Sequence, residues 1–150
     1  MPQQLLQRGH PVAAAAHAIH ESGLCIKNYY FCAGVLTLRK AVDLWSGLYR
    51  DHFGLKLSAA EDLSLPSRLR KIAEHKPQYK PAIEELIEGL ELESPDSPAK
   101  PSMCIDLKGA ADAKRLALLR APFERLHLAL TNLWELTYSS FLPGAEQSTQ

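Results

Sequence analysis

The sequence has few cysteines and no long apolar run. Cys25, Cys32 and Cys104 cannot form a closed set of disulfides, and none belongs to a C-x-x-C pair. This argues for a reducing compartment and against a structural zinc site. The most apolar stretch, residues 29–38, has about half of the roughly 20 residues that a membrane span needs. Polar residues also interrupt the N-terminal alanine run, so we expect no targeting signal and a soluble, cytoplasmic chain without membrane contact.

An excess of charge of either sign is absent as well. Seventeen basic and seventeen acidic residues cancel, so the net charge is zero. The chain therefore has no global electrostatic reason to bind nucleic acid or an anionic membrane. It also lacks a P-loop, a G-x-G-x-x-G loop, an H-E-x-x-H pair and a G-x-S-x-G elbow, which excludes the enzyme classes that these motifs mark.

The chain shows helical periodicity and no sustained two-residue alternation, so we predict an all-α, up-and-down bundle of about five helices. Most of its ten prolines lie where helices would start or stop. We expect helices over residues 12–26, 29–53, 66–75, 81–93 and 110–141.

The helix over residues 29–53 is predicted to be central in the bundle, because apolar side chains cover most of its circumference. One row of them follows four-three spacing: Phe31, Val35, Leu38, Val42, Trp45 and Tyr49. Trp45 is expected in the core, and Gly54 is expected to end the helix. Cys25 and Cys32 are interpreted as small core residues.

The last predicted helix carries a leucine-rich row that fits either packing within the bundle or a partner helix. We take it as a reason to expect a homodimer, since an exposed apolar row would need covering. Pro122 is expected to kink this helix or to divide it in two. The row consists of Leu116, Leu119, Phe123, Leu126, Leu130, Leu133 and Thr137.

The predicted organisation is one domain over residues 12–142. Residues 1–11 are expected to be a flexible N-terminus and residues 143–150 a disordered tail. Three prolines and no periodicity predict a mobile loop over residues 94–102. The segment LSAAEDLSL, residues 57–65, is also predicted to be a loop.

Charge is segregated locally. Residues 64–81 contain five basic residues and one acidic residue, whereas residues 82–97 contain six acidic residues and no basic one. One interpretation is that two neighbouring helices neutralise each other at the surface. The other is a binding surface for RNA or for a protein partner, and its basic candidates are Arg68, Arg70 and Lys71.

Two groups of polar residues are candidates for chemistry. His17, His20 and Glu21 share one helical face and could ligate a metal, but without a further ligand cluster an exposed polar face is the preferred interpretation, and we expect no metal and no cofactor. Arg120 and His127 lie two turns apart in a polar stripe with Glu124, Thr131 and Tyr138. An arginine that holds a phosphate and a histidine that moves a proton are the minimum for metal-free RNA cleavage.

Residues 17–53 resemble the first two helices of the HEPN superfamily (higher eukaryotes and prokaryotes nucleotide-binding), in particular a prokaryotic branch that occurs alone or attached to restriction and other defence proteins. In outline the resemblance covers about three quarters of the chain. The resemblance lies in an amphipathic first helix, the aromatic pair after Asn28, and the run AGVLTLRKAVD over residues 33–43. Arg39 and Asp43 stand where that branch has an arginine and an acidic residue, and both are candidate binding residues. LPSRLRKIA, residues 65–73, resembles the branch's third helix.

Active members of the superfamily carry an arginine followed, after four to six residues, by a histidine, and two such sites meet across a dimer to cut RNA. The expected place here is residues 86–93, which read LIEGLELE and contain neither residue. Arg120 and His127, later in the chain, have a fitting spacing with six residues between them. We expect a catalytically silent HEPN-like bundle that dimerises or binds a partner, with a role in prokaryotic or phage defence. A metal-independent ribonuclease and an unrelated protein-binding adaptor stay open.

Overall fold

The computed structural model describes residues 10–93 and 113–142, with side chains from residue 120 onward in the second range. The described residues contain no strand, which confirms the all-α class. The predicted features at residues 1–9, 94–102 and 143–150 lie outside the described residues. The α-helices are α1 (Pro11–Lys27), α2 (Phe31–Phe53), α3 (Ala59–Leu63), α4 (Leu65–His75), α5 (Lys80–Gly89) and α7 (Ala113–Phe141), with a short 3₁₀ helix, η2 (Pro77–Tyr79), before α5.

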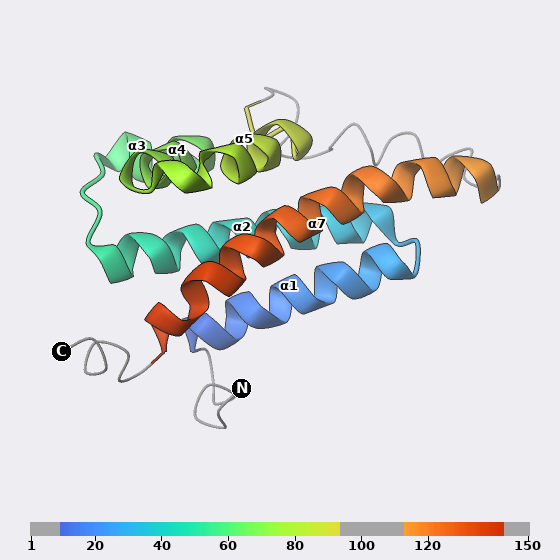
Figure 1. The fold of residues 1–150 in the computed structure, drawn as a ribbon, viewed down its shortest axis with the longest axis horizontal. Coiled ribbons are helices and arrows are strands. Elements are labelled where there is room, and N and C mark those ends of the chain that lie inside the picture. The colour runs from blue at the N-terminus through green and yellow to red at the C-terminus, as the bar shows by residue number, and fades with distance from the viewer. Residues whose placement is uncertain (1–9, 94–112, 143–150) are drawn as a thin grey trace.

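α1 and α2 form an antiparallel hairpin, whereas α7 runs in the same direction as α2, since Phe31 stacks on Phe123 and Trp45 lies beside Thr137 (Figure 1). α4 packs on another side of α2, and α5 packs on α4 and α7. α7 crosses the bundle between α1 and α5 and contacts α1, α2 and α5. This central place of α2 confirms the prediction from its wide apolar surface.

The core follows the apolar row of α2. All six residues of the predicted row are buried, and Trp45 is fully buried, as predicted. α7 contributes the opposite wall, because its own row is buried from Phe123 to Thr137. Trp45 Nε1 donates a hydrogen bond to Thr137 Oγ1 at 2.9 Å, which joins the two rows.

The row on α7 therefore packs within the bundle. This excludes its described part as a docking seam for a partner helix, which was the sequence-based reason for a homodimer. The helix also runs through Pro122 without a break, so the expectation that Pro122 divides it is wrong. A helix this well packed tolerates a proline because tertiary contacts outweigh one lost backbone hydrogen bond.

The segment over residues 57–65 is not a loop throughout, because it contains α3. Ser58 caps this helix: its side chain accepts from the Glu61 N–H at 3.2 Å, while Glu61 accepts from the Ser58 N–H at 3.1 Å. This reciprocal pair is a capping box. The backbone N–H of Ser58 is also the main cause that lowers the pKa of Glu61.

Helix ends otherwise match local sequence signals. Pro11 opens α1, Ser64 caps α4, and Gly54 ends α2 with a φ of 61° in the left-handed region. Cys25 and Cys32 are both partly exposed, so their assignment to the core is wrong.

Candidate functional site

Arg120 and His127 line one hollow between α1 and α7. The hollow has a volume of about 360 Å³. α7 places the two side chains two turns apart on the same side, and α1 forms the opposite wall. Its lining residues are Gly23, Ile26, Lys27, Arg120, Glu124, His127 and Leu128.

The ring of His127 is anchored to α1. Its Nε2 lies 2.9 Å from the carbonyl oxygen of Ile19. A carbonyl oxygen only accepts, so Nε2 carries the proton and donates it to this bond. The ring reaches the α1 backbone because Gly23 has no side chain: a Cβ there would lie 2.9 Å from His127 Nε2.

Arg120 is held by two neighbours. Its Nε donates to Glu124 one turn ahead on α7, and a terminal nitrogen donates to the Tyr29 hydroxyl at 3.2 Å. The guanidinium also stacks over the Tyr29 ring, with 5.3 Å between its central carbon and the ring centroid. The hydrogen bond to Glu124 is the main cause that raises the pKa of Arg120. Much of its donor capacity is therefore used within the chain.

Tyr29 is a site residue that sequence reasoning did not single out. It lies in the α1–α2 turn with a φ of 65°, in the left-handed region that bulky residues rarely adopt. Its ring packs edge-on against the buried Phe31, with centroids 5.9 Å apart. The aromatic pair after Asn28 was noted as part of a pattern, but nothing in that pattern indicates a left-handed residue.

The rest of the polar stripe on α7 does not join this site. Thr131 bonds the carbonyl of His127 within its own helix at 2.8 Å. Tyr138 is exposed, and its ring stacks on Trp134 with centroids 6.1 Å apart. The hollow therefore gathers Arg120, Glu124 and His127 from the stripe and leaves the other two outside.

Four of the five candidate binding residues of α2 and α4 lie in ion pairs: Asp43, Arg68, Arg70 and Lys71. The buried Arg68 of α4 pairs with Asp43 of α2, while its Nε has no hydrogen-bond partner. Arg39 lies one turn before Asp43 and is partly buried. Lys71 lies 3.3 Å from the Glu61 carboxylate and 3.6 Å from that of Glu74. Its hydrogen bond with Glu61 is the main cause that raises the Lys71 pKa.

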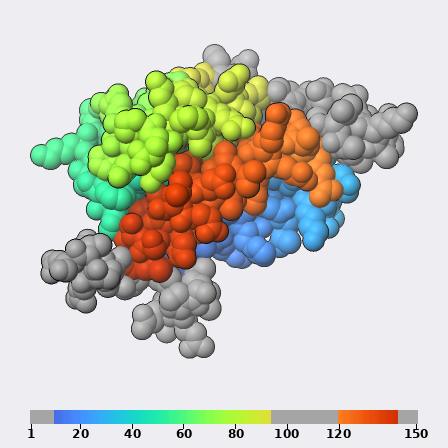
Figure 2. Space-filling model, in the orientation of Figure 1, coloured from blue at the N-terminus to red at the C-terminus, as the bar shows by residue number. Residues whose placement is uncertain are grey.

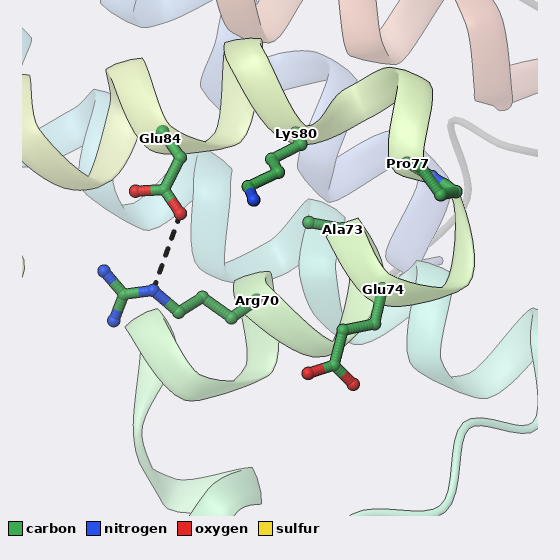
Figure 3. A pocket seen from close by; sticks show the side chains of 6 residues that line it. All are labelled: Arg70, Ala73, Glu74, Pro77, Lys80 and Glu84. Atoms are coloured by element: carbon green, nitrogen blue, oxygen red, sulfur yellow. Dashed lines mark ion pairs between the residues drawn. The ribbon is translucent and has the colours of Figure 1, made fainter.

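Arg70 bridges the basic and acidic segments. It binds both carboxylate oxygens of Glu93, one of them at 2.7 Å, and it lies 3.6 Å from Glu84 of α5. Figure 3 shows the Glu84 contact at the edge of a hollow of about 440 Å³ between α4 and α5, into which Lys80 also extends. These pairs support mutual neutralisation of α4 and α5, and a binding role for these residues stays a prediction.

The histidines of α1 do not gather ligands. His17 and His20 are exposed, and His17 lies 3.7 Å from Glu21 on the same helix. Within residues 10–93 and 120–142, no group of three histidine, cysteine, aspartate or glutamate side chains is placed to hold a metal ion. Nor does any helix in the described part of the chain have the length and hydropathy to cross a bilayer.

Comparison of the chain with protein-family models, with curated proteins and with solved structures gives no match.

Proposed function

We propose that this chain is a catalytically silent, HEPN-like helical bundle that acts as a dimerising or partner-binding module. The observation that carries the proposal is the hydrogen bond from His127 Nε2 to the Ile19 carbonyl, at 2.9 Å. A general acid or base must exchange a proton with its substrate, and this nitrogen already donates its proton to the protein. The residues of the superfamily's usual catalytic position, 86–93, also contain no arginine or histidine.

Arg120 supports the same interpretation. A catalytic arginine presents free N–H groups in a fork to the phosphate. Arg120 already uses N–H groups on Glu124 and Tyr29, and the Glu124 carboxylate in the hollow repels a phosphate. The arrangement joins α7 to α1 and to the α1–α2 turn, which is a structural role.

A binding role is supported by exposed apolar side chains on α7. Leu128 is 57% exposed and Leu136 is 64% exposed, on a helix whose other side forms the core. Several exposed leucines in a row indicate a partner-binding surface more often than a single exposed leucine does. The cytoplasmic location belongs to this proposal through the three cysteines, which indicate a reducing compartment. The role in prokaryotic or phage defence belongs to it through the resemblance of residues 33–43.

The test is cleavage of single-stranded RNA in the presence of EDTA. We expect wild type and His127→Ala to leave the RNA as intact as the buffer does. A matched control, His17→Ala, changes an exposed histidine that lies outside the hollow. Cleavage by wild type and by His17→Ala, with none by His127→Ala, would overturn the proposal.

A metal-independent ribonuclease is the second candidate. One observation favours it: Arg120 and His127, at the spacing of the superfamily's catalytic pair, line the same hollow beside Lys27. For cleavage, His127 would have to act through Nδ1 or release the Ile19 carbonyl. The third possibility is an unrelated protein-binding adaptor that also uses the exposed surface of α7. In that case, binding of the partner should not depend on Arg39 or Asp43.

A further inference from the structure

The solvent side of α7 carries a second regular row of residues. We call it the outer face. Its members recur with four-three spacing and are all exposed, so it lies opposite the buried row that packs against α2. Figure 2 shows α7 as a band across one side of the molecule, flanked by α5 and α1. The outer face consists of Ala121, Arg125, Leu128, Asn132, Glu135, Leu136 and Ser139.

The apolar members of the outer face are placed symmetrically. Leu128 precedes Asn132 by four residues and Leu136 follows it by four, so the two leucines lie about 6 Å along the helix on either side of Asn132. Both are more than half exposed. A single exposed leucine is common on protein surfaces. These two leucines, however, lie on either side of Asn132, whose short polar side chain could contact Asn132 of a second copy.

The charged members of the outer face are unpaired. Neither Arg125 nor Glu135 forms an ion pair with any residue whose side chain the structure describes. This contrasts with the basic residues of α4, because Arg68, Arg70 and Lys71 all have carboxylate partners. Arg125 lines a hollow with Glu85 and Glu88 of α5 but forms no ion pair with either. The outer face thus presents one positive and one negative charge next to two leucines.

We propose that the outer face of α7 binds the outer face of a second copy, with the two helices antiparallel and Asn132 at the two-fold axis. The proposal rests on the proposed function and names its interface. In this arrangement Leu128 of one copy packs beside Leu136 of the other, twice. Arg125 lies about 6 Å along the axis from Glu135 of the other copy, within reach of its long side chain.

Self-complementarity is the reason to choose a second copy over another partner. A two-fold interface requires one patch to contain both halves of each contact, and this row contains a leucine for each leucine and an opposite charge for each charge. The row extends over about 27 Å, and α1 and α5 flank it. A specific interface needs roughly 1,000 Å², so α1 and α5 contribute to the contact on either side of the row.

The test is sedimentation equilibrium of wild type and two charge reversals, Arg125→Glu and Glu135→Arg. Each single reversal sets like charges against each other at both ends of the interface, so each should weaken the dimer at least ~10-fold. An equimolar mixture of the two variants should restore dimers, because the mixed pair again has opposite charges at both ends. Lys40→Glu, which changes an exposed charge on α2, should behave as wild type.

Several outcomes would overturn this interface. Wild type that stays at 16.6 kDa at about 100 μM excludes it. So does a dimer that both reversals leave unchanged, which would place the contact elsewhere. Weakened single variants that do not recover on mixing would exclude the antiparallel pairing. Each of these results leaves the RNA test untouched, so failure of the interface and failure of catalytic silence can be told apart.

Discussion

The imidazole of His127 occupies the space that a side chain at residue 23 would fill. Gly23 lets α7 bring this ring to the backbone of α1, where Nε2 meets the Ile19 carbonyl. The contact explains how a polar residue on α7 stabilises the bundle from a position beside its core. Gly23 and His127 are 104 positions apart in the sequence, so mutation of either residue tests how α1 packs against α7.

A side chain at residue 23 should displace His127. The Cβ of Gly23→Ala would lie 2.9 Å from Nε2, so we expect a loss of about 1 to 3 kcal/mol in the free energy of unfolding, measured with urea. Gly47→Ala is the control, because its nearest neighbour is 3.8 Å away and alanine favours helix. Equal stability of the two variants would show that the His127 anchor does not constrain residue 23.

Gly89 serves α5 and α7 in a similar way. A Cβ at Gly89 would lie 2.3 Å from Leu126 Cδ2, and Leu126 is buried, so its side chain has little room to move. We expect Gly89→Ala to lose about 1 to 3 kcal/mol of stability. Gly89→Ala combined with Leu126→Ala should cost less than the sum of the two single changes. Strict additivity in the same denaturation assay would contradict this contact.

The hydrogen bond between Trp45 and Thr137 should contribute measurably to stability. Thr137→Val keeps the shape of the side chain but leaves the buried indole N–H without an acceptor, which costs about 1 to 3 kcal/mol. Trp45→Ala should cost about 3 to 5 kcal/mol through the cavity it creates. Thr37→Val is the control, since the Thr37 hydroxyl bonds only within its own helix. If Thr137→Val loses no more stability than Thr37→Val, the hydrogen bond between Trp45 and Thr137 does not stabilise the fold.

Stability should fall at high pH because of Tyr49. Burial raises the pKa of Tyr49 to about 12, above its ordinary value of 10.0. Between these two pH values the unfolded chain releases the proton and the folded chain keeps it, so unfolding becomes easier as pH rises. The loss should be on the order of 2 kcal/mol. The free energy of unfolding of Tyr49→Phe should therefore fall less between pH 10 and pH 12 than that of Tyr138→Phe, which removes an exposed tyrosine. An equal fall in both variants would show that Tyr49 does not cause the pH dependence.

Most of the helical architecture could be predicted from the sequence. The apolar row of α2 identifies both the helix and its central place, because a helix that is apolar around most of its girth must be covered on several sides. α3 was missed since five residues show no periodicity, although Ser58 and Glu61 carry the spacing of a capping box. The alternative that Pro122 divides the last helix was wrong, because a local rule about proline ignores the tertiary contacts of α7.

The site could be predicted only in part. The seven-residue spacing of Arg120 and His127 indicates a shared direction, and both residues do line one hollow. Their partners could not be predicted, because Ile19, Gly23 and Tyr29 are distant in sequence and reach α7 only through the packing of α1. The sequence-based reason for a dimer was wrong for the same reason: periodicity locates a row of leucines but does not say whether the bundle already covers it.

The central claim is that His127 is anchored to α1 by a hydrogen bond that its Nε2 donates to the Ile19 carbonyl. Long-range proton–nitrogen NMR of the imidazole ring tests it most directly, since the spectrum reports which ring nitrogen carries the proton. We predict that the neutral ring of His127 has a single tautomer, with the proton on Nε2 and slow exchange of that proton with water. A spectrum in which His127 averages between both tautomers, as the exposed His17 should, would contradict it.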